Sequence, residues 1–127
     1  MHATILVIED NKDNMELADY LLRAYGYTPL LASGGLEAIP IAVEQRPDLI
    51  LLDVGMPGMD GYDVAVAIRQ HPALHRTRIV AVTASAMVGD RERIAAAGFD
   101  GYIPKPINPE TFIRQIERFL PAALVSP

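Results

Sequence analysis

Acidic, hydroxyl and amine side chains follow four of the five short apolar runs in this sequence. Glu9 and Asp10 come after the first run, Asp53 after the third, Thr83 at the end of the fourth, and Lys105 shortly after the fifth. Three carboxylates held close together repel one another, and a hard divalent cation relieves that repulsion. A carboxylate nucleophile, a cation, a lysine and a hydroxyl are what the formation of an aspartyl phosphate requires. If the fold gathers these residues, their types predict that Asp53 accepts a phosphoryl group in the presence of Mg²⁺.

Each of these residues also has a structural explanation when it is considered alone. Asp10, Asn11 or Asp13 could cap the helix that follows, and Asp53 could be an ordinary turn residue. Thr83 is typical of a β-strand, and Lys105 is typical of a solvated surface. Only their joint occurrence at the ends of successive apolar runs favours a functional site.

The elements that must position these residues are strands and helices in alternation. The predicted strands cover residues 4–8, 28–32, 49–52, 79–82 and 101–103, and the predicted helices cover 11–25, a stretch around 36–43, 62–70, 87–97 and 109–120. The first, third and fourth runs are continuously apolar, which is typical of strands buried on both faces. Pro29 cannot donate to a β-ladder, so the second strand is expected at an edge. The pattern predicts an α/β fold of the doubly wound (βα)5, flavodoxin-like type, with a five-stranded parallel sheet in the order 2-1-3-4-5.

Several helix details follow from single residues. Tyr25 is expected on the buried face of the first helix. Pro40 falls inside the second helical stretch and predicts either a kink or a later start. Asn108 is the expected N-cap of the last helix, with Pro109 at its first position.

The strand order brings the candidate residues together. In an open parallel sheet the functional crevice lies at the carboxyl ends of the strands. Strands 1 and 3 are neighbours in the predicted order, so Glu9, Asp10 and Asp53 should converge. Thr83 and Lys105 should lie beside them.

Composition excludes several classes of protein. The chain has 127 residues, no cysteine and a net charge of -5. This length fits one domain over residues 1–127, with a core at about 4–120 and a C-terminal tail at 121–127. An acidic chain lacks the clustered Lys and Arg that direct nucleic-acid binding needs, and no apolar run is long enough to span a membrane. The N-terminus has no secretory signal and the chain no cysteine, so we expect a cytoplasmic protein.

The motifs together resemble the receiver domain of two-component response regulators. They are Glu9-Asp10-Asn11, the loop from Asp53 to Gly61, Thr83-Ala84, and Tyr102 followed by Lys105-Pro106. The resemblance extends from about Thr4 to Leu120. It implies a phosphorylation-dependent signalling switch, and not an enzyme that turns over an external substrate.

The resemblance also implies a role for each metal-site residue. Asp53 would be the phosphoacceptor and Asp10 the main Mg²⁺ ligand, with Glu9 assisting. The backbone carbonyl of Gly55 would complete the protein ligands, and Mn²⁺ could replace Mg²⁺. Gly55 offers no side chain where receivers often place a polar one, which leaves the lifetime of the phosphoryl group open.

A second group of residues would bind the phosphoryl group or respond to it. By resemblance, Lys105 would pair with the phosphoryl oxygens, and the Lys105–Pro106 peptide bond would be cis. Thr83 would swing towards the phosphoryl group and Tyr102 would turn inward behind it. The small Ala84 would leave Tyr102 room to move.

The implied partners are proteins. A histidine kinase or a histidine phosphotransferase would donate the phosphoryl group. A downstream protein target would bind the face made by the fourth helix, fifth strand and fifth helix. Only seven residues follow Leu120, so we expect a stand-alone regulator or relay intermediate unless the chain belongs to a longer protein.

Three other functions are weighed against this one. A magnesium-dependent phosphatase with an Asp nucleophile usually has a second Asp two residues on, where this chain has Gly55. A flavin or nucleotide binder of the same fold would need a Gly/Ser/Thr-rich phosphate loop after the first strand, where residues 9–13 are acidic. A receiver that binds partners without being phosphorylated is the third alternative.

Overall fold

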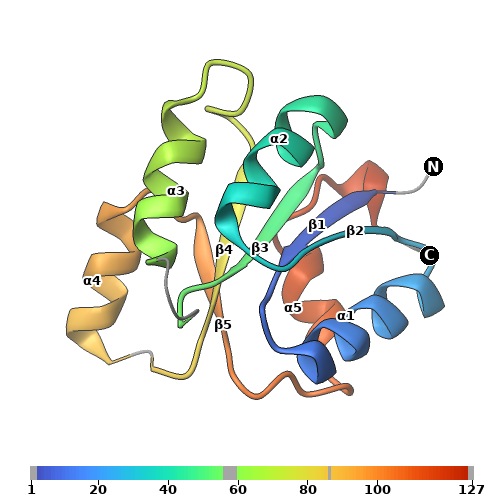
Figure 1. Cartoon of the computed structure of the whole chain (residues 1–127). Helices are drawn as coiled ribbons and strands as arrows, with labels where there is room; N and C mark the ends of the chain where they lie inside the picture. The colour runs from blue at the N-terminus through green and yellow to red at the C-terminus, as the bar shows by residue number, and fades with distance from the viewer. Residues whose placement is uncertain (1–2, 56–59, 86, 126–127) are drawn as a thin grey trace.

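A computed structural model describes residues 3–55, 60–85 and 87–125 of the chain. Five strands form one parallel sheet in the order β2-β1-β3-β4-β5, which confirms the predicted order (Figure 1). The strands are β1 (Thr4–Ile8), β2 (Thr28–Ala32), β3 (Leu49–Asp53), β4 (Arg78–Thr83) and β5 (Gly101–Pro104). The predicted flavodoxin-like (βα)5 fold is therefore correct.

Five α-helices connect or follow the strands. They are α1 (Lys12–Ala24), α2 (Gly35–Gln45), α3 (Gly61–Gln70), α4 (Val88–Ala96) and α5 (Phe112–Glu117). Two begin at acidic or amide caps: Asn11 accepts from the amide of Asn14 before α1, and Asp60 accepts from the amide of Tyr62 before α3. Such caps satisfy amides that would otherwise lack a partner. None of the helices in the described ranges is long and apolar enough to cross a membrane.

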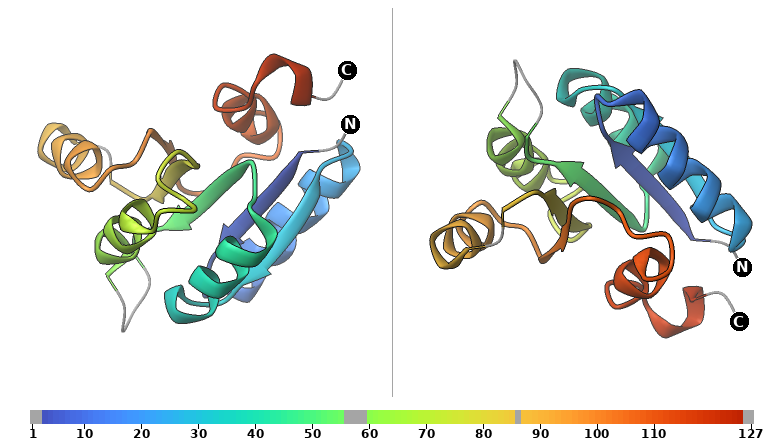
Figure 2. Two further views of the ribbon diagram at one scale, coloured as in Figure 1. Left: turned by 90° about the horizontal axis from the view of Figure 1, so that it is seen from above. Right: turned by 90° about the horizontal axis from the view of Figure 1, so that it is seen from below.

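The sheet is covered on both faces, as the continuously apolar strands predicted. Helices α1 and α5 pack on one face and α2, α3 and α4 on the other (Figure 2). Alternate residues of β3 enter the two cores: Leu49 and Leu51 face α1 and α5, while Ile50 and Leu52 face the other three helices. All are at most 2% exposed, so β3 is held rigidly up to its last residue, Asp53.

Pro29 and Pro40 were each expected to affect the element that contains them. Pro29, in β2, lies opposite Ile5 of β1. Strand β2 is an edge strand, as predicted. Pro40 lies inside α2, and the helix starts at Gly35, so a later start is excluded. Proline inside a helix removes one backbone hydrogen bond, but the buried Ala38 and Ala42 keep α2 packed on the sheet.

The prediction for the last helix was too long. Regular helix covers only Phe112–Glu117, and its N-cap is Thr111, so the predicted N-cap at Asn108 and first helical position at Pro109 were wrong. Asn108 instead organises the turn before the helix. The side chain of Asn108 accepts a hydrogen bond from the amide of Glu110 at 2.9 Å. The backbone carbonyl of Asn108 accepts from the amide of Phe112, also at 2.9 Å. These bonds make residues 109–111 a turn before the helix. After it, the amide of Phe119 bonds to the carbonyl three residues earlier, so the regular helix has ended.

One further expectation, for Tyr25, was wrong. Tyr25 is 50% exposed and does not belong to the buried face of α1, because Gly26 follows it with φ 85° and turns the chain away. The C-terminal tail contains a 3-10 turn, Ala122–Leu124. Leu124 and Val125 pack against the core on the α1–α5 face, so this part of the tail is structured.

Candidate functional site

The carboxyl ends of β1, β3, β4 and β5 meet at one edge of the sheet (Figure 1). The ladders continue one residue beyond the strands: the amide of Glu9 bonds to Ala32, that of Val54 to Val82, and that of Lys105 to Thr83. These bonds fix the residues after each strand as firmly as the strands themselves. The functional side chains are therefore carried by rigid backbone.

Three carboxylates converge at this edge. Oxygens of Glu9, Asp10 and Asp53 all lie within 4.8 Å of one another. Glu9 and Asp53 are buried, at 5% and 2% exposure, whereas Asp10 is exposed. Asn11, and not Asp10, caps α1, so capping does not account for the position of Asp10.

Lys105 supplies the positive charge. Its Nζ lies 2.7 Å from Oδ2 of Asp53 and 3.7 Å from Oε2 of Glu9. The lysine follows β5 and is itself largely buried, with a side chain 22% exposed. Its peptide bond to Pro106 is cis. An ammonium this close to a buried carboxylate offsets part of the negative charge gathered at this edge.

The other oxygen of Asp53 is held by the backbone. The amide of Gly55 donates to Oδ1 at 2.8 Å, so both carboxylate oxygens have a defined direction. Residues 56–59 of the predicted Asp53-to-Gly61 motif lie outside the described residues. At the far end of that motif, Gly61 packs directly on Val54: a Cβ at position 61 would lie 2.6 Å from the Cα of Val54. The glycine therefore permits the start of α3 to pack directly on the backbone at the end of β3.

Glu9 is the titratable group with an unusual environment. Burial raises its pKa above the ordinary value of 4.5, and the neighbouring carboxylate of Asp53 raises it further. Lys105 and the side chain of Asn14 lower the pKa of Glu9 but do not cancel the rise. Its Oε1 accepts from the amide of Asn11 at 3.2 Å and from the Asn14 side chain at 3.3 Å. The site therefore disfavours the charged form of Glu9, because the carboxylate is removed from water and lies beside a second carboxylate.

The donor set fits a hard divalent cation. Lys105 is the one basic side chain within ion-pair distance of Glu9 or Asp53 among the described residues. With the three carboxylates ionised, the cluster keeps two negative charges in excess. Carboxylate oxygens are the ligands that Mg²⁺ and Mn²⁺ prefer in proteins. Binding of one such ion would balance the charge and relieve the repulsion around Glu9.

Thr83 and Tyr102 lie near this edge but face elsewhere. The Thr83 hydroxyl donates to the carbonyl of Ser85 at 2.8 Å and accepts from the amide of Ser85 at 3.1 Å. Tyr102 is half-buried against the core, with the guanidinium of Arg91 5.8 Å from its ring centre. Within residues 3–55, 60–85 and 87–125, neither side chain hydrogen-bonds to Asp53. Ala84, next to Thr83, is exposed.

Sequence reasoning missed two contributors to the site region. Asn14 was not considered, although it lies three residues after the cap of α1 and so on the face turned towards Glu9. The second is Arg93 of α4. Its guanidinium lies 3.9 Å from the ring centre of Tyr62 and 3.2 Å from the carboxylate of Asp60, which links α4 to the start of α3.

Comparison with known proteins agrees with this geometry. A family model for the response regulator receiver domain matches residues 5–117. The chain belongs to this family. A curated relative of the receiver is the polar-differentiation response regulator DivK of Brucella anthropi, which is 41% identical over 120 residues, covering 94% of this chain and 98% of the relative.

Solved structures show the same fold around the receiver's site. The chemotaxis protein CheY4 of Vibrio cholerae superimposes with a TM-score of 0.90 at 30% identity, covering 94% of this chain and all of the other. The receiver domain of a sensor histidine kinase of Pseudomonas aeruginosa is 36% identical, with a TM-score of 0.84 and coverage of 94% and 98%. That structure holds a magnesium ion in its active-site cleft.

Proposed function

We propose that this receiver is a signalling switch that accepts a phosphoryl group on Asp53 from a phosphohistidine of a histidine kinase or histidine phosphotransferase. The observation that carries the proposal is the setting of the Asp53 carboxylate: Gly55 holds Oδ1 at 2.8 Å and Lys105 meets Oδ2 at 2.7 Å. One oxygen of this nucleophile is oriented by an amide, and its other oxygen lies beside an ammonium. This arrangement favours in-line attack on phosphorus.

The transfer balances simply. An oxygen of Asp53 forms a bond to phosphorus while the bond from phosphorus to the donor imidazole nitrogen breaks. The imidazole leaves with the electron pair and, when it accepts a proton, becomes neutral histidine. Lys105 stabilises the charge on the transferred oxygens. The receiver thus catalyses at most its own phosphorylation and its later hydrolysis.

Glu9, Asp10 and Asp53 would hold the metal ion, together with the backbone carbonyl of Gly55. Mg²⁺, or Mn²⁺ in its place, would neutralise charge on the phosphoryl oxygens as transfer proceeds. The buried pair Glu9 and Asp53 provides the charge that selects a divalent ion, and the exposed Asp10 leaves the site open to the donor.

Phosphorylation would then shift the receiver between two conformations. A phosphoryl group adds negative charge and strong acceptors beside Lys105. The Thr83 hydroxyl would leave its bonds to Ser85 and donate to the new acceptor, and the space beyond Ala84 would admit the Tyr102 ring. The face made by α4, β5 and α5 would change, and a downstream protein would bind it. We expect this exchange to take place in the cytoplasm.

Intact-mass analysis tests the proposal. The wild-type receiver and Asp53→Asn are incubated with acetyl phosphate, with Mg²⁺ or with EDTA. A gain of one phosphoryl group in the wild type alone, abolished by EDTA, is the expected result. If no donor phosphorylates Asp53, the chain is a receiver that binds partners without phosphorylation. Hydrolysis of a phosphomonoester such as p-nitrophenyl phosphate with many turnovers would instead indicate a phosphatase.

A further inference from the structure

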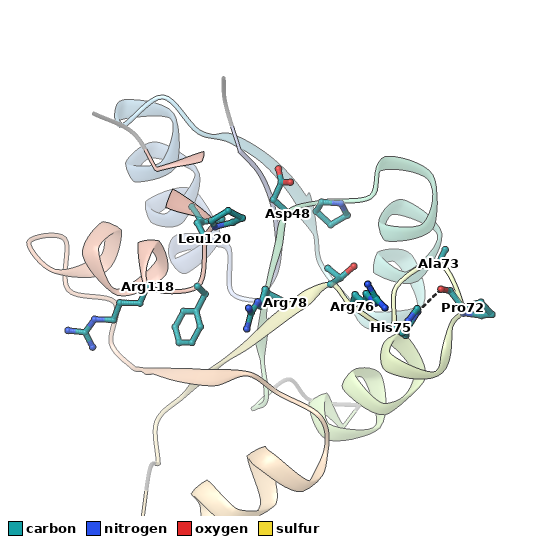
Figure 3. A pocket seen from close by; sticks show the side chains of 12 residues that line it. Asp48, Pro72, Ala73, His75, Arg76, Arg78, Arg118 and Leu120 are labelled. Atoms are coloured by element: carbon teal, nitrogen blue, oxygen red, sulfur yellow. Dashed lines mark hydrogen bonds between the residues drawn. The ribbon is translucent and has the colours of Figure 1, made fainter. Parts of the chain in front are cut away.

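A cavity of about 610 Å³ lies at the end of the sheet opposite to Asp53 (Figure 3). Asp48, directly before β3, and Arg78, the first residue of β4, line it. Asp53 and Thr83 end the same two strands. A strand of five residues spans roughly 15 Å, so the cavity and the phosphoacceptor site are separate.

The cavity collects positive charge in an acidic protein. Arg76, Arg78 and Arg118 line it together with His75, whereas the chain as a whole has a net charge of -5. The one carboxylate in the lining, Asp48, accepts from the amide of Thr4 at 2.8 Å. Two positive charges therefore remain in excess without counting His75.

These arginines are not used to hold the fold together. Arg76 and Arg118 are exposed, and their guanidinium groups form no hydrogen bond or ion pair within the described part of the chain. Arg78 reaches Asp100 only at 3.9 Å, and its side chain is 60% exposed. The other oxygen of Asp100 already accepts from Ile79 and Arg69. The guanidinium groups keep their donors available for a ligand.

Arg69, unlike the three arginines of the lining, uses its guanidinium to hold the fold together, and it makes one wall of the cavity rigid. It donates to the carbonyls of His75 at 2.9 Å and Thr77 at 2.7 Å, and so fixes the segment between α3 and β4 that forms one wall. Nδ1 of His75 lies 2.9 Å from the carbonyl of Pro72, as the dashed line in Figure 3 shows. Leu74, in the middle of the segment, is fully buried. The wall therefore exists before any ligand binds.

An aromatic side chain forms part of the opposite wall. Phe119 lines the cavity, and its ring packs on Gly101 of β5 so closely that a Cβ there would collide with it. The ring is thus held in place. A fixed apolar ring beside guanidinium groups suits a ligand that has a planar part and an anionic part.

We propose that this cavity binds a phosphate-bearing organic anion of nucleotide size. Its volume lies within the range of about 300–1,000 Å³ that is typical of small-molecule sites. Guanidinium groups bind phosphate through paired hydrogen bonds. Phe119 and the proline rings of the wall contact the apolar part. The site shares no residue with the Glu9, Asp10, Asp53 and Lys105 cluster, so it does not depend on the proposed phosphorylation.

Calorimetric titration with three probes tests the site: ADP, pyrophosphate and a triglutamate peptide. EDTA is present throughout, so that no metal recruits phosphate to the Asp53 site. ADP is expected to bind at least about fivefold more tightly than pyrophosphate, because only ADP uses the apolar wall. Arg76→Ala and Arg118→Ala are each expected to weaken ADP binding about five- to tenfold. Arg114→Ala removes the same charge from the exposed side of α5 and is expected to bind as the wild type does.

Other results would overturn the inference. If ADP does not bind at millimolar concentration, the cavity is not a ligand site. The same conclusion follows if Arg76→Ala and Arg118→Ala leave ADP binding unchanged. If pyrophosphate binds as tightly as ADP, the ligand need not be of nucleotide size. If triglutamate binds as tightly as ADP, the site does not select phosphate over carboxylate. Asp53→Asn is expected to bind ADP as the wild type does, whatever the outcome of the phosphorylation experiment. Loss of binding in that variant would place the ligand in the Asp53 site instead.

Discussion

The ammonium of Lys105 lies 2.7 Å from Oδ2 of Asp53, across the gap between the carboxyl ends of β5 and β3. The two strands are not neighbours, because β4 lies between them. The lysine therefore reaches over the end of β4 to pair with a buried carboxylate. A phosphoryl group on Asp53 would enter directly beside this ammonium.

Replacing Lys105 is expected to slow phosphorylation strongly. Lys105→Ala removes the charge that meets the transferred oxygens, and loss of one such group lowers rates roughly 100-fold. The measurement is the rate of phosphoryl incorporation by intact mass at saturating Mg²⁺. Lys12 is the chain's other lysine and lies on the exposed side of α1, with a side chain 88% exposed. Lys12→Ala should match the wild type, and equal rates for both variants would contradict the role of Lys105.

Glu9→Gln is expected to stabilise the metal-free receiver at neutral pH. The folded-state pKa of Glu9 is raised, so the fold binds its proton more tightly than the unfolded chain does. Stability then falls as pH rises from the ordinary value of 4.5 through the raised pKa, and the loss is complete above it. Gln keeps the oxygen that accepts from Asn11 and Asn14 but carries no charge.

Urea unfolding in EDTA measures this effect. The advantage of Glu9→Gln over the wild type should be present at pH 8 and should disappear below pH 4.5, where Glu9 is protonated in both states. Mg²⁺ should stabilise the wild type more than the variant, since the variant lacks one ligand. An advantage of equal size at both pH values would show that charge burial at Glu9 is not its cause.

Gly61→Ala is expected to destabilise the receiver by about 1–3 kcal/mol. The new Cβ would lie 2.6 Å from the Cα of Val54 and 3.0 Å from the carbonyl oxygen of Asp53, and backbone atoms of a central strand cannot move aside cheaply. Displacement of this backbone should also slow phosphorylation. Gly89, in α4, has no atom within 4 Å of its ideal Cβ. Gly89→Ala should therefore leave stability unchanged or raise it by up to about 1 kcal/mol, because alanine favours helix.

Much of the fold follows directly from the sequence. Residues 49–52 of β3 are a continuous apolar run, and only a sheet covered on both faces can bury such a run. The parallel order then places Asp53 beside Glu9 without any knowledge of side-chain conformation. The carboxylate cluster could be predicted because backbone topology alone determines it.

Other features depend on contacts that no periodicity encodes. The short α5 results from Asn108, whose side chain and carbonyl make a turn where the pattern of apolar residues continues the helix. The place of Arg93 over the Tyr62 ring depends on how α4 packs against α3. The basic cavity joins Arg76 and Arg118, which are far apart in the sequence. Such features require the tertiary structure.

Thr83 provides the sharpest test of the switch, since its hydroxyl is bonded to Ser85 and not to the Asp53 site. Thr83→Ala should still be phosphorylated, because Asp53, Lys105 and the metal ligands are unchanged. It should not show the amide chemical-shift changes around Tyr102 that phosphorylation causes in the wild type, because the methyl group cannot donate to the phosphoryl oxygens. Thr83→Ser keeps the hydroxyl and should retain those changes. NMR spectra of each variant before and after acetyl phosphate with Mg²⁺ provide the comparison. If Thr83→Ala responds as the wild type does, the hydroxyl is not the group that couples Asp53 to the face of α4, β5 and α5.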